Sequence, residues 1–282
     1  MGALPVRDEA MRRALEARLE SGEIELPLLP ASVATVLDLC YSPDSSASSL
    51  SKAIHRDQGL AGHLLRVANS PAYFADGRIV SLQQAISRLG QRTIGEIAVA
   101  ISVRGAVFQS SRFQTDVRAL WGHAAAAGAF AREIARALRK SVDTSLLCGL
   151  LQDVGKPVVI HWIEELETEQ GTAVPKQLAL DLAEEFHTAV GACMVERWSM
   201  PPAVIGATRF HHRYSEAPAF QDEARIAHLS DRLAQHLLAP ETYDAQMLHG
   251  ELAFAELNLY PDDVDAIVAK GDEVRKFAEA IA

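Results

Sequence analysis

The chain has 282 residues, of which 49% are apolar and 23% charged, and its formal net charge is −10 at pH 7. These proportions are those of a folded globular protein, and they exclude a disordered chain and a collagen-like repeat. The basic residues are scattered among more numerous acidic ones and form no block that could follow a phosphate backbone. We therefore expect no nucleic-acid partner.

Three cysteines lie in apolar helical patterns without any CxxC pair, at Cys40, Cys148 and Cys193. This usage predicts buried, reduced thiols. The longest apolar run, around residues 94–108, is interrupted by two charged side chains, so we expect no membrane span. The N-terminus becomes charged before a secretory apolar segment could develop. Together these features predict a cytoplasmic protein.

Helical periodicity dominates the first half of the chain. Apolar residues recur three and four positions apart within residues 33–40, 60–68, 82–89 and 94–101. Ser81 with Gln84 forms a capping-box pattern at the start of the third stretch, and Gly90 is placed to end it. These segments predict a set of short helices.

The second half opens with an alanine-rich helix from Gln114 to about Lys140. Residues 146–151 are too densely apolar for a surface helix, which places them in the middle of a bundle, and we expect this helix to end at Gly155. The one strand-like run, residues 158–163, follows a proline suited to a helix start, and we interpret it as helix. Helices over 203–213 and 220–238 and an amphipathic tail complete the predicted all-α fold.

Histidines and acids in the second half form a candidate metal-ligand set, comprising His123, Asp153, His187, His211 and Asp231. Helical bundles build metal sites by projecting imidazoles and carboxylates from several helices into one cavity. Neutral imidazoles suit Mn, Fe, Ni or Zn, and one carboxylate can bridge two cations. Spacing alone leaves other interpretations open: a hydrogen-bonded interior histidine at 123, a solvated helix end at 211–212, and an ion pair between Asp231 and Arg225 or Arg232.

The chain resembles the HDOD domain, a regulatory relative of the HD phosphohydrolase superfamily. The resemblance rests on LPLLPASVATVLDLCYSPDSSASSLSKAIHRDQGLAGHLLRVANSPAYF, SLQQAISRLG, LWGHAAAAGAFAREIA, GLLQDVGK and VGACMVERWSMPP, and it extends from about Ile24 to Asp231. The block around Asp57 and Asn69–Ser70 is its most specific part. The resemblance implies two helical lobes, the second an HD-like bundle.

Superfamily ligands follow the order H…HD…H…H…D, which the resemblance transfers to His123, Gln152–Asp153, His187, His211 and Asp231. Gln152 stands where the superfamily has the histidine of its HD doublet. An amide oxygen is a poor replacement for an imidazole nitrogen as a ligand of transition metals. The loss of the imidazole should lower metal affinity at least about 10- to 100-fold. The GYP signature of the HD-GYP relatives is absent after residues 211–212, which disfavours cyclic-di-GMP hydrolysis.

We therefore expect a first lobe over residues 1–112, an HD-like bundle over 113–238 and a helical tail over 239–282. The leading hypothesis is a non-catalytic signalling output domain that acts through contacts with a signalling protein, with no required cofactor. The sequence is also compatible with a weakly bound divalent transition metal and with a homodimer. The alternative is a metal-dependent phosphohydrolase or nucleotide phosphodiesterase. A third class, a small-ligand sensor, would need a suitable pocket between the lobes.

Overall fold

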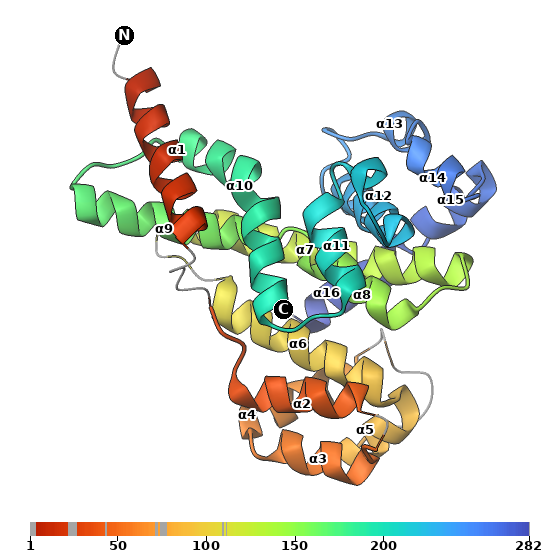
Figure 1. Ribbon diagram of the computed structural model, residues 1–282. Helices are drawn as coiled ribbons and strands as arrows, with labels where there is room; N and C mark the ends of the chain where they lie inside the picture. The colour runs from red at the N-terminus through yellow and green to blue at the C-terminus, as the bar shows by residue number, and fades with distance from the viewer. Residues whose placement is uncertain are drawn as a thin grey trace.

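The computed structural model describes residues 4–21, 27–42, 44–70, 73, 78–108, 110 and 112–281. Throughout these ranges the regular structure is helical and contains no strand, which confirms the all-α prediction. The helices form a first lobe, a larger second bundle and a C-terminal group beside that bundle (Figure 1). Apolar residues from all three parts join in one continuous core.

The described part of the first lobe contains five helices, three of which begin at a capping side chain, Ser46, Asp57 or Ser81. The helices are α2 (Ala31–Tyr41), α3 (Ala47–His55), α4 (Gln58–Ala68), α5 (Leu82–Leu89) and α6 (Gln91–Val107). The Ser81 hydroxyl accepts the Gln84 backbone N–H, which confirms one half of the predicted capping box, whereas the Gln84 side chain accepts the backbone N–H of Val80. Gly90 separates α5 from α6 with a φ of +86°, a conformation in which a β-carbon would be strained.

The motif around Asp57 and Asn69 has a structural role in this lobe. Asp57 caps α4 by accepting the Leu60 N–H, and its other oxygen accepts the Ser32 hydroxyl of α2. The Asn69 side chain exchanges two hydrogen bonds of 2.8 Å with the backbone of Ile79. The most specific part of the sequence resemblance therefore ties together the helices and the returning chain of the first lobe.

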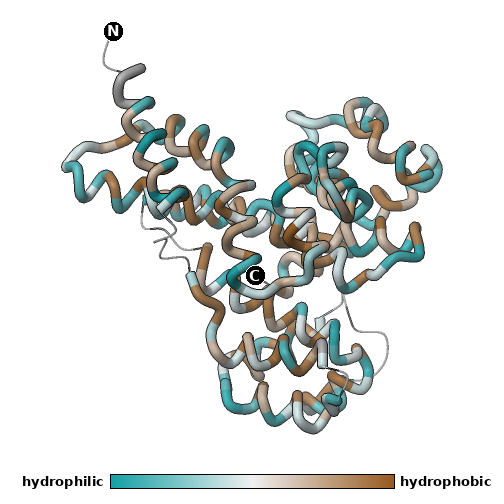
Figure 2. The backbone as a smooth tube through the Cα atoms, viewed as in Figure 1, coloured by the Kyte–Doolittle hydropathy of each residue, from teal (hydrophilic) through white to brown (hydrophobic). Residues whose placement is uncertain are grey.

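The second bundle contains the long helices and the most apolar segments, which lie at its centre in Figure 2. Its helices are α7 (Gln114–Ala137), α8 (Val142–Leu151), α9 (Gly155–Gln170), α10 (Lys176–Arg197), α11 (Pro202–Phe210) and α12 (Gln221–Leu238), with a short 3₁₀ turn at Tyr214–Glu216. Helices α7 and α8 pack closely, because a β-carbon on Gly149 would lie 2.6 Å from the Ala127 carbonyl oxygen. Small residues thus bring the helix backbones together around the polar cluster described below.

The boundary between α8 and α9 differs from the prediction. Helix α8 ends at Leu151, and Gly155, expected to end a helix, instead begins α9, which contains the strand-like run 158–163. The reason is packing: a β-carbon at Gly155 would lie 2.1 Å from the His187 carbonyl oxygen of α10.

Among the described residues, one helical stretch, Val142–Gln170, is long and apolar enough to cross a membrane, but 89% of its most apolar window is buried inside the protein.

The helices near the two ends of the chain each pack against the second bundle. Helix α1 (Leu4–Ser21), assigned by sequence to the first lobe, packs on α9 and α10 of the second bundle, where Arg18 pairs with Glu165 at 2.6 Å. The C-terminal group consists of α13 (Ala245–His249), α14 (Leu252–Glu256), α15 (Pro261–Val268) and α16 (Gly271–Ile281). Helix α16 contacts α4, α6 and α7, so it bridges both lobes.

Candidate metal centre

Five elements of the second bundle bring the predicted ligand residues to one place. His123 comes from α7, Gln152 and Asp153 from the turn after α8, His187 from α10, His211 from the end of α11, and Asp231 from α12. The histidines and aspartates form two overlapping groups that share Asp153 and whose ligand atoms lie within 4.8 Å of one another. The structure also adds His212 to the cluster.

The first group, which we call the three-imidazole half, consists of Asp153, His187, His211 and His212. The Asp153 Oδ1 atom lies 3.2 Å from His187 Nε2 and 3.7 Å from His211 Nε2. The His187 Nε2 atom in turn lies 3.4 Å from His211 Nε2 and 3.1 Å from His212 Nε2. One carboxylate oxygen and three ring nitrogens therefore face a common point.

Backbone carbonyls fix the tautomers of two of these rings. The His187 Nδ1–H donates to the Glu184 carbonyl at 2.5 Å, and the His211 Nδ1–H donates to the Thr208 carbonyl at 3.1 Å. Neutral rings held in this way present unprotonated Nε2 lone pairs, the form that binds metals. Two lone pairs facing each other at 3.4 Å are repulsive unless a cation lies beside them.

The three-imidazole half fits a divalent transition metal. Asp153 is 4% exposed, and its Oδ1 atom is buried without a hydrogen bond from any described residue. Burial alone would raise the pKa of Asp153, but opposing interactions, of which the charge of Lys156 is the largest, hold it well below its ordinary value. Burial and the neighbouring rings lower the pKa of His212 to about 3, so this imidazole stays neutral. A charged oxygen with neutral nitrogens is a donor set suited to Mn, Fe, Ni or Zn.

The second group consists of His123, Asp153 and Asp231. Gln152 lies against it, and we call His123, Gln152 and Asp231 the amide half. The Asp231 Oδ1 atom accepts hydrogen bonds from His123 Nε2 at 2.7 Å and from Gln152 Nε2 at 3.1 Å. Burial opposes charge on both partners, yet their interaction raises the pKa of His123 and lowers that of Asp231 to about 2. The Gln152 amide thus places a donor where the superfamily has a ligand, while its buried Oε1 atom has no hydrogen-bond partner among the described residues.

A lysine and a cavity complete the surroundings. Lys156 Nζ donates to Asp153 Oδ2 at 3.1 Å and pairs with Glu184 Oε2 at 2.8 Å, so it orients the shared aspartate. A cavity of about 610 Å³ opens onto the cluster and is lined by residues that include His123, Asp153, Lys156, His212 and Arg232. Its size is that of a small-molecule site.

The sequence analysis treated the ligand positions as a single set weakened by Gln152. In the structure they form two groups that share Asp153, and Gln152 donates to Asp231 of the second group. His212 was open to interpretation as a solvated helix end, but its side chain is 31% exposed and its ring contacts both His187 and His211. The adjacent pair of histidines at the end of one helix was the signal that could have indicated it.

An all-helical bundle that gathers histidine and aspartate side chains from successive helices defines a protein of the HD-like class. The HDOD domain profile matches residues 26–214, and the chain belongs to the HDOD family. A proposed metal-dependent phosphohydrolase of Shewanella amazonensis has the same fold, with a TM-score of 0.77 and 20% identity over 98% of this chain and 99% of its own.

Two other relatives are longer than this chain. A proposed signal transduction protein of Marinobacter aquaeolei is 21% identical, with a TM-score of 0.67, and the match covers 97% of this chain and 66% of that one. An uncharacterized protein of Treponema pallidum is 27% identical over 203 residues, which are 69% of this chain and 39% of that protein. This chain therefore spans well under half of that curated relative.

Proposed function

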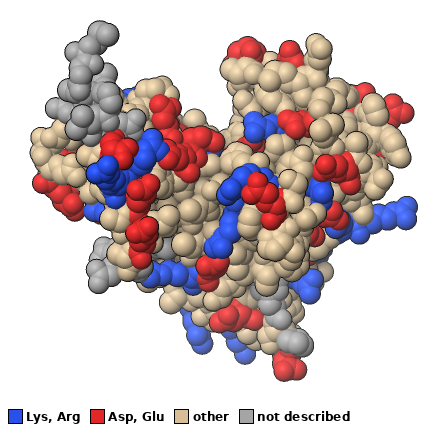
Figure 3. All heavy atoms as spheres, turned by 45° about the horizontal axis from the view of Figure 1, so that its top comes forward, with Lys and Arg blue, Asp and Glu red and all other residues tan. Residues whose placement is uncertain are grey.

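We propose that the chain is a non-catalytic regulatory HDOD module that acts by contact with a signalling protein in the cytoplasm. Its second bundle holds one divalent transition metal on the three-imidazole half of the cluster. Membership of the HDOD family supports the regulatory role, as does the description of the Marinobacter relative as a signal transduction protein. Side chains of both signs are interspersed on the surface drawn in Figure 3, which suits a protein partner better than a nucleic acid.

One observation supports the non-catalytic part of this proposal. The Gln152 side chain is completely buried and donates from Nε2 to the same Asp231 oxygen that His123 contacts. A bound metal would supply Lewis-acid polarisation and an activated water for attack on a phosphoester. In this chain the Gln152 amide cannot ligate through nitrogen, and His123 and Asp231 satisfy each other. His123 and Asp231, which would help to complete a second cation site, are thus hydrogen-bonded to each other, and Gln152 offers that site only an amide oxygen.

The test combines metal binding with an activity screen. Purified protein should bind about one equivalent of Mn²⁺, Ni²⁺ or Zn²⁺ in titration calorimetry, and the Asp153→Asn variant should bind each at least about 10- to 100-fold more weakly. Asp262→Asn, a change at an exposed carboxylate of α15, is the matched control and should bind as wild type does.

The same metal-loaded proteins are then assayed with p-nitrophenyl phosphate, bis-p-nitrophenyl phosphate and cyclic di-GMP. We expect wild type and Asp153→Asn to give the same background rate. Turnover by wild type that Asp153→Asn abolishes would overturn the non-catalytic proposal, and equal metal binding by these two proteins would overturn the assigned metal half.

The cavity beside the cluster favours one competing function, a metal-dependent phosphohydrolase or nucleotide phosphodiesterase. Lys156 and Arg232 line this cavity together with Asp153, and cationic side chains at such a position can hold a phosphate group. Against it stands the engagement of Lys156 by two carboxylates, Asp153 and Glu184. The activity screen decides between the two functions.

A further inference from the structure

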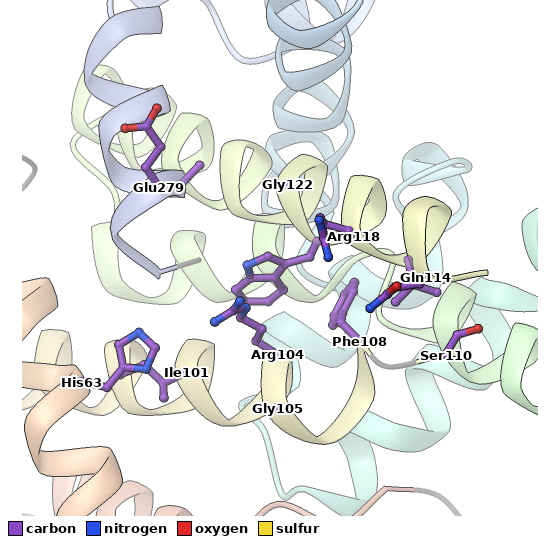
Figure 4. Close-up of a pocket in the computed structure, with 13 residues that line it drawn as sticks. His63, Ile101, Arg104, Gly105, Phe108, Ser110, Gln114, Arg118, Gly122 and Glu279 are labelled. Carbon is purple, nitrogen blue, oxygen red and sulfur yellow. The ribbon is translucent and has the colours of Figure 1, made fainter. Parts of the chain in front are cut away.

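A second cavity lies away from the metal centre, where the two lobes and the C-terminal helix meet. It has a volume of about 860 Å³, and its lining comes from α4, α6, α7 and α16 and from the segment between α6 and α7. Figure 4 shows side chains from these elements around one space. A volume of this order accommodates a drug-sized molecule.

Two buried polar atoms of the lining residues lack hydrogen-bond partners within the part of the chain that the structure describes. Trp121 is 4% exposed, and its Nε1–H has no acceptor among the described residues. The Nε2 atom of His63 is also buried, and the described residues offer it no partner. Buried donors and acceptors are nearly always satisfied, so an unsatisfied indole N–H at a cavity indicates a missing partner in that cavity.

The cavity also carries positive charge in an acidic protein. Arg104 and Arg118 both line it, and neither guanidinium forms an ion pair or hydrogen bond with another described residue. The acidic residue of the lining is Glu279, whose carboxylate points away from both arginines in Figure 4. Burial, together with the charges of Arg66 and Arg104, lowers the pKa of His63. Two free guanidinium groups provide the bidentate donors that bind phosphate.

Aromatic and apolar side chains form another part of the wall. The Phe108 and Trp121 rings pack edge to face with centroids 5.0 Å apart, and Ile101 and Val117 lie beside them. Such a surface matches the faces and edges of a planar ring. The cavity therefore offers a ring-binding wall, an unsatisfied indole donor and two free cations.

We propose that this cavity binds a small molecule in which a planar ring carries a phosphate group, the chemical class of a nucleoside monophosphate. Arg104 and Arg118 hold the phosphate, the aromatic wall contacts the ring, and Trp121 Nε1–H donates to a ligand acceptor. Because α6, α7 and α16 all contribute to the lining, an occupant stabilises the contact between the lobes. The proposed regulatory module would thereby respond to a small-molecule signal.

The experiment observes the indole N–H groups of the three tryptophans by ¹⁵N-labelled NMR, with Trp121→Phe assigning the relevant signal. The probes are AMP, GMP and CMP, compared with adenosine, guanosine, cytidine and inorganic phosphate. We expect at least one of the nucleotides to shift the Trp121 signal saturably, and its nucleoside and inorganic phosphate to bind at least about tenfold more weakly, since each lacks one part of the contact.

The Arg104→Gln/Arg118→Gln double variant should weaken nucleotide binding at least about tenfold, since it removes charge-assisted hydrogen bonds. Arg13→Gln/Arg275→Gln removes two exposed charges on other helices and should bind as wild type does. Asp153→Asn should also bind normally, which separates this site from the metal centre.

Three results would overturn the proposal: no shift of the Trp121 signal with any nucleotide, equal binding by the double variant and wild type, or equal binding of inorganic phosphate and nucleotide.

Discussion

The two lobes hold their buried carboxyl groups in opposite protonation states. In the second bundle, Asp153 and Asp231 have lowered pKa values because cationic and imidazole groups surround them and outweigh the effect of burial. In the first lobe, Glu96 is 3% exposed, and burial together with the nearby charge of Asp143 raises its pKa to about 9, despite the opposing charge of Arg132.

This difference separates a binding site from a structural group. A buried carboxylate kept charged, with an oxygen free of hydrogen bonds and neutral imidazoles around it, is arranged to receive a cation. A buried carboxyl kept neutral is a weak ligand and shares its proton with a neighbour, as Glu96 does in its hydrogen bond with Asp143. Burial of an acid alone does not indicate a metal site.

The largest effect is expected from Gly155→Ala, which breaks the helix packing that holds the charged cluster. Its β-carbon would meet the His187 carbonyl oxygen, a backbone atom that moves only if α9 and α10 separate. We expect a loss of about 3 kcal/mol in the free energy of unfolding and of most of the metal-dependent rise in melting temperature. Chemical denaturation and thermal melts with and without Ni²⁺ measure both.

Gly62→Ala is the matched control, since a β-carbon there would lie in open space on α4. It should leave metal binding unchanged and stabilise the protein by about 0.5–1 kcal/mol through helix propensity. If Gly155→Ala behaves like this control, the close contact between α9 and α10 does not position His187.

A smaller effect is expected from Glu96→Gln, which tests the neutral carboxyl of the first lobe. The folded protein keeps the Glu96 proton up to about pH 9, whereas the unfolded chain loses it near pH 4.5. The folded state binds more protons between these values, so stability falls as pH rises through this window, by at most about 1.4 kcal/mol per pH unit. Glu96→Gln should remove this slope and be more stable than wild type at pH 8.

Urea denaturation at pH 5, 6, 7 and 8 provides the measurement for both proteins. The exposed variant Glu279→Gln should retain the wild-type pH dependence. Identical pH slopes for wild type and Glu96→Gln would mean that Glu96 is charged in the folded protein, and the contrast between the lobes would then disappear.

Sequence patterns predicted the helices well because apolar spacing and caps are local, as at Ser81 and Gly90. The cluster residues were predicted through a family resemblance, and their convergence follows from the bundle. The division of the cluster could not be predicted, because it depends on which Asp231 oxygen the Gln152 amide meets. Gly155 was misinterpreted because its packing partner, the His187 carbonyl, is distant in sequence. The cavity between the lobes depends on α16 crossing both of them.

The smallest effect is expected from Gln152→His, which tests whether the two halves are independent. A histidine at this position replaces an amide donor with a ring nitrogen at similar bulk, and so supplies the amide half with a ligand beside His123 and Asp231. Wild type should bind one equivalent of metal. The variant should bind a second equivalent, and its affinity for that equivalent should exceed the wild-type affinity at the same position by about tenfold, which corresponds to about 1.4 kcal/mol.

Titration calorimetry with Mn²⁺, Ni²⁺ and Zn²⁺, each with a chelated blank, measures stoichiometry and affinity. Gln170→His, which adds an imidazole at the exposed end of α9, controls for an extra histidine alone and should bind one equivalent. If Gln152→His instead strengthens the first equivalent without adding a second, residue 152 belongs to the same site as the three imidazoles. The hydrogen bond from Gln152 to Asp231 would then lower the metal affinity of the whole cluster, because Asp153 connects both halves.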